Sequence, residues 1–291
     1  LGDVYKRQIV RDWLFVILFV SNIPASAGSN DAAFGGFESK TGKGQISFSN
    51  PGYELSHISK DGAPVIKPEM EGAGSKSEPG QPDLPTMSTY YAVEAGKTFT
   101  INASIKESEV IENVEVVPFE TWDSQPTGVI GKGVAYQQSS SFPANIATVS
   151  DPMVFRDIVM VQVSVTPFQY NPVSKTLTVI HEIDLELVES GEIEFPHIPQ
   201  KKSREFEILY ESLVVNYPST TREGEEVYQR PSILYVLPNN IGNLLGTVEE
   251  LMNWKRRVGF DVQYVSTSSI VNNRNNLKNY IEDAYETWEN P

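Results

Sequence analysis

The chain has 291 residues, 40% of them hydrophobic, with a formal net charge of -15 and a pI near 4.7. This length and apolar content suffice for about two domains with separate cores. The negative charge disfavours nucleic acid or an acidic membrane surface as a partner, because both would repel the chain. The absence of cysteine excludes disulfides, thiolate metal ligands and a thiol nucleophile within these residues.

The first residues have the pattern of a secretory signal peptide. Basic residues, Lys6 and Arg7 among them, precede an apolar run from Trp13 to Val20, and the small residues Ala25 and Ala27 then form an A-x-A site. The run is too short to span a bilayer, which takes about 20 apolar residues, and the alternative interpretation is a buried core helix. We expect a signal peptide over residues 1–27, cleavage after Ala27 and no membrane span.

Two segments of small and turn-forming residues come next. Residues 28–43 are rich in Gly, Ser, Ala and Asn, which predicts a flexible lead. Residues 69–85 are rich in Gly, Ser and Pro and end in Gly80-Gln81-Pro82-Asp83-Leu84-Pro85. Because proline removes a backbone donor, this second segment is predicted to be a connector and not a central strand.

Alternating apolar and polar residues predict strands over 97–106, 110–117, 158–165 and 177–187. The third run places Val159, Val161, Val163 and Val165 on one face. A break at residues 171–175 separates it from the fourth run, which predicts a hairpin with a strongly acidic polar face. Short strands with turn signals between them indicate a β-sandwich or a related all-β domain.

The pattern changes after a polar linker over residues 217–231. A continuous apolar run over 233–238 predicts a strand buried on both faces, and 260–265 predicts a second strand. Helical spacing follows each of them, at 244–255 and at 277–288. Strand, helix, strand and helix in succession indicate the start of a parallel α/β sheet.

Residues with catalytic or metal-binding chemistry are few. His57, His181 and His197 have no H-x-x-x-H or H-E-x-x-H spacing, so no metal site is predicted from them. His181 falls at an inward position of its strand and is expected to be a partly buried, hydrogen-bonded imidazole. The acidic residues over 182–194 alternate along a strand, which favours a solvated face over calcium ligands.

Several motifs, in a fixed order, resemble the precursors of gingipain-type cysteine peptidases. Those in the first part resemble the propeptide: Gly80-Gln81-Pro82-Asp83-Leu84-Pro85, Phe155-Arg156-Asp157 and Gln169-Tyr170-Asn171-Pro172. Those in the second part resemble the opening of the catalytic domain: Ile233 to Pro238, Trp254-Lys255 and Gly259-Phe260-Asp261-Val262. The resemblance covers roughly residues 45–291.

This resemblance implies a β-rich propeptide domain over residues 28–222, then a linker and the first β-α-β-α units of a caspase-like α/β catalytic domain over 223–291. It also implies a secreted or cell-surface endopeptidase that acts on proteins or peptides, and a propeptide that packs on its own catalytic domain. The Cys nucleophile and the His are expected beyond Pro291, because the resemblance places both at the ends of later strands. Leu1 is not an initiator Met, and both ends of the sequence indicate a fragment. The fragment should therefore be inactive. No cofactor is expected, although calcium is compatible with the later part of the catalytic domain.

Processing is expected at Arg222, since the resemblance places the cleaved arginine in the linker before the first catalytic strand. The alternative is that Arg222 is an ordinary linker charge. Arg230 is a poorer cleavage site because Pro231 follows it. Lys132 and Arg156 are both candidates for the propeptide side chain that fills the specificity pocket.

Two other interpretations remain. The full protein would be a non-catalytic secretion or cell-surface component with gingipain-like architecture, or a β-sandwich adhesion module. The α/β pattern after residue 232 disfavours the adhesion module, which needs no such sheet.

Overall fold

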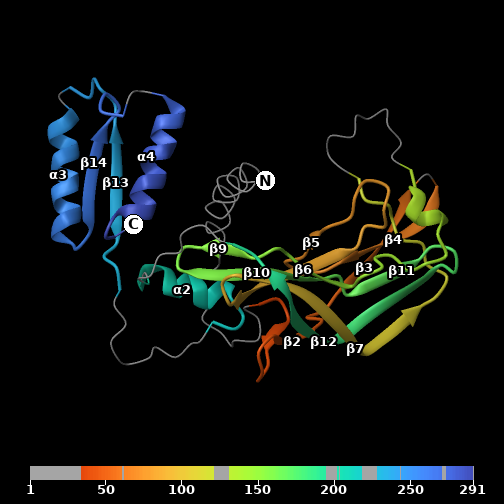
Figure 1. Ribbon diagram of the computed structural model, residues 1–291. Coiled ribbons are helices and arrows are strands. Elements are labelled where there is room, and N and C mark those ends of the chain that lie inside the picture. Colours follow the sequence, from red (N-terminus) through yellow and green to blue (C-terminus); the bar gives the residue numbers. More distant parts are fainter. Residues whose placement is uncertain are drawn as a thin grey trace.

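A computed structural model shows a mainly β part followed by a small α/β part (Figure 1). The signal peptide, with Ala25 and Ala27, lies outside the described residues, and so does Arg222. The described residues are 34–60, 62–120, 131–194, 202, 204–217, 228–242, 244–270 and 273–290.

The first sheet is organised around one long strand, β12 (Thr176–Glu192). Strand β7 (Lys97–Ile111) pairs with it from Leu177 to Glu192, while β11 (Phe168–Asn171) and β2 (Gln45–Ser49) pair with successive parts of β12. Because Leu177 and Ile183 each have two partners, β7 must follow one edge of β12, and β11 and β2 the other. Strand β1 (Phe37–Ser39) completes the sheet beside β2.

The second sheet has β10 (Ile158–Val165) at its centre. Strand β6 (Pro85–Val93) pairs antiparallel with β10, and β5 (Gly74–Ser75) adds to β6. Two short strands, β8 (Ala147–Val149) and β9 (Met153–Phe155), pair with the two halves of β10. A separate hairpin of β3 (Glu54–Lys60) and β4 (Ala63–Glu69) and a short 3-10 helix, η3 (Val134–Gln137), lie outside both sheets.

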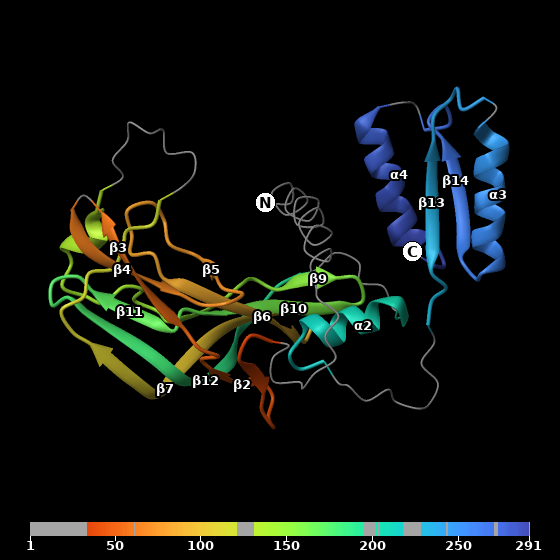
Figure 2. The ribbon, with the colours of Figure 1, turned by 180° about the vertical axis from the view of Figure 1, so that it is seen from behind.

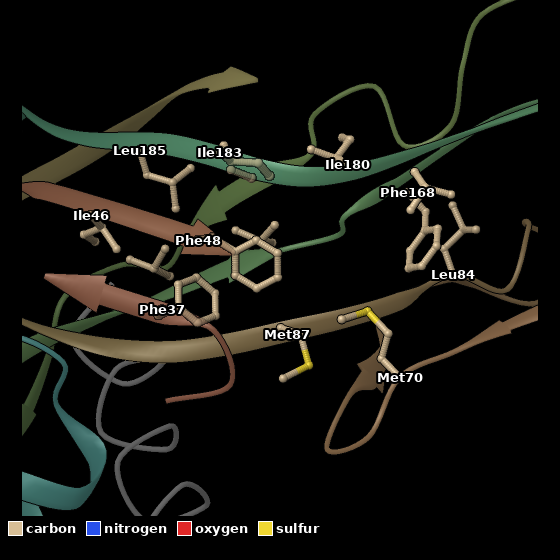
Figure 3. Packing of buried hydrophobic residues seen from close by; sticks show 14 of the residues in the cluster. Phe37, Ile46, Phe48, Met70, Leu84, Met87, Phe168, Ile180, Ile183 and Leu185 are labelled. Carbon is tan, nitrogen blue, oxygen red and sulfur yellow. The ribbon is translucent and has the colours of Figure 1, made fainter. Parts of the chain in front are cut away.

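The core lies between these two sheets, as the close-up of buried side chains shows (Figure 3). Phe48, Ile183 and Leu185 from the first sheet and Met87 and Tyr91 from the second all belong to it, each with at most 6% of its surface exposed. Burying such side chains stabilises the fold by about 1.5–3 kcal/mol each. The predicted β-sandwich is therefore confirmed as two packed sheets.

The α/β part consists of β13 (Ser232–Leu237), α3 (Leu244–Arg257), β14 (Asp261–Ser266) and α4 (Arg274–Thr287). The two strands pair in parallel, from Ser232 with Asp261 to Leu237 with Ser266. Figure 2 shows α3 beside β14 and α4 beside β13. The predicted strand–helix alternation is confirmed. However, β13 is only half-buried over most of its length, because it has a single partner strand among the described residues.

Three sequence-based expectations were wrong in detail. The lead does not stay irregular to residue 43, because Phe37 is 4% exposed and β1 extends the first sheet. No strand continues from 112 to 117, since β7 ends at Ile111 and only an isolated bridge forms at Val116. Residues 158–165 do form a strand with the predicted buried face, but β11, and not β10, makes the hairpin with β12.

A helix that the sequence analysis missed, α2 (Arg204–Leu213), lies along the second sheet near β9 and β10 (Figure 1). Its C-terminal end is attached to β6 by the Asn216 side chain. Asn216 Oδ1 accepts from Ala92 N at 2.7 Å, and Asn216 Nδ2 donates to Ala92 O at 2.9 Å. The backbone N–H of Val215 also donates to Tyr90 O at 2.9 Å.

Candidate functional site

The histidines that the structure describes lie on separate strands, His57 on β3 and His181 on β12. His57 is exposed on β3, and His197 falls outside the described residues. No group of three His, Cys, Asp or Glu that could hold a metal ion occurs among the residues that the structure describes. Within the same residues, no helix has the length and apolar character needed to cross a membrane.

His181 is partly buried and contacts a polar partner, as expected, but it does not lie on the inward face of its strand. A register shift between Ile180 and Glu182 inserts a bulge in β12 at this residue, so both Ile180 and Ile183 are buried while the His181 side chain is 33% exposed. Its Nε2 lies 3.4 Å from Glu109 Oε1, which also accepts from the Tyr53 hydroxyl at 2.6 Å. This contact raises the pKa of Tyr53 to about 12.

The acidic residues of β12 form a solvated face, as the alternation predicts. Glu182, Glu186, Glu189 and Glu192 are exposed. Lysines on neighbouring strands and turns pair with this face: Lys40 and Lys106 with Asp184, Lys43 with Glu189, and Lys97 with Glu192. Lys40 and Lys106 lower the pKa of Asp184. Several of these carboxylates are therefore engaged in ion pairs with lysine side chains.

The motif at residues 80–85 has a structural role. Its backbone holds two chain segments that are distant in sequence: Phe119 N donates to Gln81 O at 2.7 Å, and Gly133 N donates to Gly80 O at 2.8 Å. Gly80 has φ +85°, and an added Cβ would lie 3.2 Å from Gly133 N. A left-handed, closely packed position of this kind favours glycine. The turn thus fixes both ends of segment 121–130, which lies outside the described residues.

Lys132, one of the two candidates for the inhibitory side chain, is engaged within the β part itself. Its Nζ pairs with Glu115 and lies 5.7 Å from the centre of the Tyr136 ring. Lys175 Nζ approaches the same Glu115 at 3.2 Å, and the two lysines lower the pKa of Glu115. In this structure Lys132 anchors the chain beside the Gly80 turn.

Arg156, the other candidate, lies in a cluster of aromatic and charged residues between the β9–β10 turn and α2. It has φ +55°, a left-handed conformation that is uncommon for residues other than glycine. Its guanidinium lies 4.4 Å from the centre of the Phe206 ring on α2. Next to it, Asp157 Oδ1 accepts from the buried Tyr210 hydroxyl at 2.5 Å.

Burial changes the ionisation of both partners in this cluster. It raises the pKa of Asp157, against the opposing effect of the Tyr210 hydrogen bond, because a charged carboxylate loses solvation there. Burial and Asp157 together raise the pKa of Tyr210, which therefore stays protonated. Among the described residues, Asp157 Oδ2 has no hydrogen-bond partner.

The same cluster faces the α/β part. The C-terminal end of α4 lies near β9 and α2 in both views (Figures 1 and 2). Burial raises the pKa of Tyr285 on α4, and the charges of Arg156 and Asp157 lie close enough to act on the same hydroxyl. The charges of Arg156 and Asp157, on the β9–β10 turn, thus act on a residue of α4 across the boundary between the two parts.

Helix α2 also holds both ends of segment 218–227, which contains Arg222. On one side, the Tyr217 ring lies 5.3 Å from the Tyr210 ring. On the other, the Tyr228 hydroxyl donates to Glu207 Oε1 at 2.8 Å. The signal for α2 was present in the sequence, since Phe206, Leu209, Tyr210 and Leu213 are spaced at i, i+3, i+4 and i+7.

Comparison with known proteins identifies two consecutive regions. Residues 37–233 match the family model Propeptide_C25, and residues 227–291 match the model Peptidase family C25. Gingipain R2 of Porphyromonas gingivalis strain W83 is 27% identical over 226 residues, which cover 72% of this chain and 29% of that protein. Gingipain R1 of Porphyromonas gingivalis is 28% identical over 220 residues, covering 72% of this chain and 22% of that protein.

A solved structure described as the complex of Porphyromonas gingivalis RgpB pro- and mature domains has a similar fold. It aligns with a TM-score of 0.53 and 25% identity, covering 64% of this chain and 98% of the matched chain. This chain spans less than a third of the length of these curated relatives. Since the propeptide model covers more than half of its residues, the chain belongs to the C25 propeptide family and continues into the start of a C25 peptidase domain.

Proposed function

We propose that this chain is the N-terminal part of a gingipain-like cysteine endopeptidase zymogen, in which the β part keeps the enzyme latent. The observation that carries the proposal is that a propeptide region and a peptidase region follow one another in one chain. The first is folded mainly as β-strands, and the second as alternating strands and helices. A purely adhesive module has no use for the parallel β13–β14 pair that follows the sandwich.

The catalytic groups belong to residues outside these 291. In a cysteine peptidase a thiolate attacks the scissile carbonyl, a histidine transfers protons and backbone amides stabilise the oxyanion. These 291 residues include no cysteine, so the chain has no such nucleophile and is inactive alone. The substrates of the full protein are proteins or peptides.

The propeptide acts by packing on its own catalytic domain. The effect of the Arg156 and Asp157 charges on the Tyr285 hydroxyl of α4 supports this arrangement. The matched complex of pro- and mature domains of a relative also supports it. The proposed division is a signal peptide over 1–27, removed after Ala27 for export to the cell surface or medium, a propeptide over 28–222 and the peptidase from 223 onward.

Activation begins with cleavage after Arg222. Its segment is held at both ends by α2, through Tyr217 and Tyr228, and this supports its role as the junction between the two parts. Arg230 is an unsuitable site, because Pro231 follows it and its backbone N–H donates to Asn290 Oδ1 at 3.1 Å.

The test is expression of the full-length precursor with Arg222→Gln, and with Arg230→Gln as the matched control. We expect the unchanged protein and R230Q to give a mature N-terminus at Glu223 with thiol-dependent peptidase activity. R222Q should accumulate uncut. Mass spectrometry that finds an active enzyme with an intact Arg222–Glu223 bond would reject this processing site. A precursor that stays inactive after cleavage would favour the non-catalytic secretion or cell-surface component.

A further inference from the structure

Tyr228, immediately after segment 218–227, is bound to α2 by its side chain. Its hydroxyl donates to Glu207 Oε1 at 2.8 Å, and the Arg204 guanidinium lies 5.1 Å from the centre of its ring. A phenol that donates to a carboxylate makes a charge-assisted hydrogen bond, which is stronger than a neutral one. An arginine over the same ring adds a cation–π attraction.

The backbone next to Tyr228 is bound as well. Gln229 N donates to Lys202 O at 2.9 Å, and Lys202 and Tyr228 form a parallel β-bridge. Gln229 is 4% exposed, which is unusual for a polar residue in a connection between two parts of a chain. Side chain and backbone thus attach the same two residues to the start of α2.

The next residue belongs to the α/β part. Arg230 N donates to Asn290 Oδ1, whose amide group donates to Asp261 Oδ2 at 3.3 Å on β14. Asp261 N in turn donates to Pro231 O at 2.9 Å. Tyr228 and Gln229 thus contact the β part, whereas Arg230 and Pro231 contact the α/β part. Residues 228–231 therefore connect the two parts directly.

We propose that Tyr228 and Gln229 form a latch, docked on Lys202, Arg204 and Glu207, that holds the start of the α/β part on the propeptide independently of the covalent connection through segment 218–227. The proposal rests on the proposed function only in taking that segment as the processing site. A cut there leaves the latch intact. Cleavage alone therefore does not release the propeptide, and separation requires that the latch contacts break.

The test uses the 291-residue chain with the recognition sequence of a specific protease placed within residues 218–227, so that the cut does not depend on the chain's own processing. After cutting, we expect the two pieces to co-elute in size-exclusion chromatography. Loss of one charge-assisted hydrogen bond corresponds to a factor of about 10 to 100 in a dissociation constant. Tyr228→Phe should weaken the cut complex by that factor, and Tyr228→Ala by more.

Matched controls separate the latch from general effects on the fold. Glu211→Gln changes the same charge on an exposed position of α2, and Tyr264→Phe removes a hydroxyl from an exposed tyrosine of β14, so neither should alter the dissociation constant. Glu207→Gln leaves a neutral amide oxygen that can still accept from Tyr228, so it should weaken the cut complex less than Y228F does. Combined with Y228F it should add nothing to the effect of Y228F alone, because the donor is then already absent.

Equal dissociation constants for the unchanged chain and Y228F, or pieces that separate on cutting without any substitution, would overturn the latch. Thermal unfolding of the uncut variants shows whether Y228A folds, and Y228F gives the answer where it does not. Neither readout involves peptidase activity, so an inactive full-length protein would reject the proposed function without touching this result.

Discussion

Removing the hydroxyl of Tyr210 should destabilise the chain in a pH-dependent way. Tyr210 is fully buried and donates to Asp157 Oδ1, while its ring packs 5.7 Å from Phe155 and 5.3 Å from Tyr217. Tyr210→Phe keeps the ring contacts and removes only the donor. A hydrogen bond to a charged group contributes about 1.5–3 kcal/mol, and a neutral one about 0.5–1.5 kcal/mol.

The direction of the pH effect follows from the pKa of Asp157. Burial raises this pKa above its ordinary value of 3.8. Asp157 therefore contributes stability that is fully present below its unfolded pKa and is lost as the pH rises through the folded pKa. The Tyr210 hydroxyl opposes this loss, because it donates to the ionised carboxylate. Without the hydroxyl the folded pKa rises further, and more stability is lost at neutral pH.

We therefore expect Y210F to lower the free energy of unfolding by about 1.5–3 kcal/mol near pH 7, but only by about 0.5–1.5 kcal/mol near pH 3, where the carboxyl is neutral. Urea unfolding at both pH values measures this difference. Tyr136→Phe is the matched control, since the Tyr136 hydroxyl donates to the neutral carbonyl of Val116 at 2.8 Å and should cost the same at both. A loss in Y210F that does not grow with pH would refute the reasoning.

Two further substitutions test the core and the Gly80 turn. Phe48→Ala should lower the free energy of unfolding by about 3–5 kcal/mol, because Phe48 is 0% exposed. As its control, Val134→Ala at a 70% exposed position should change the free energy of unfolding by no more than about 0.5 kcal/mol. Gly80→Ala should cost about 1–3 kcal/mol for backbone strain, plus the contact with Gly133, and should speed amide exchange at Gly133. Gly72→Ala is its control: φ is +74° there, but no atom lies within 4 Å, so G72A should cost less, and an equal cost would discount the contact.

Periodicity predicted the faces of the strands better than their partners. The valines at 159, 161, 163 and 165 are all buried as expected. Yet the chain passes from one sheet to the other at Thr166 and Pro167, so β10 pairs with β6 and leaves the hairpin to β11. An alternating pattern specifies which side of a strand is apolar but carries no information on which strand lies beside it.

The α/β part was predicted more fully, because the 3.6-residue period at 277–288 is long and regular. Helix α2 has the same spacing in only ten residues, next to a polar stretch, and was overlooked. The contacts of the candidate site join residues that are distant in sequence, such as Tyr228 with Glu207 and Asp157 with Tyr210. A local sequence pattern does not predict such pairs. Only the folded arrangement of β9, β10 and α2 brings them together.

The central place of β12 in the first sheet affects how the chain folds during synthesis. Both β2 and β7 pair with β12, which leaves the ribosome long after either of them. Until then β7 has no partner, and its backbone donors and acceptors are available to other chains. Contacts between such distant segments also form slowly. A newly made chain therefore passes through a prolonged stage with unpaired strand edges, in which a chaperone that covers β7 would suppress misassembly.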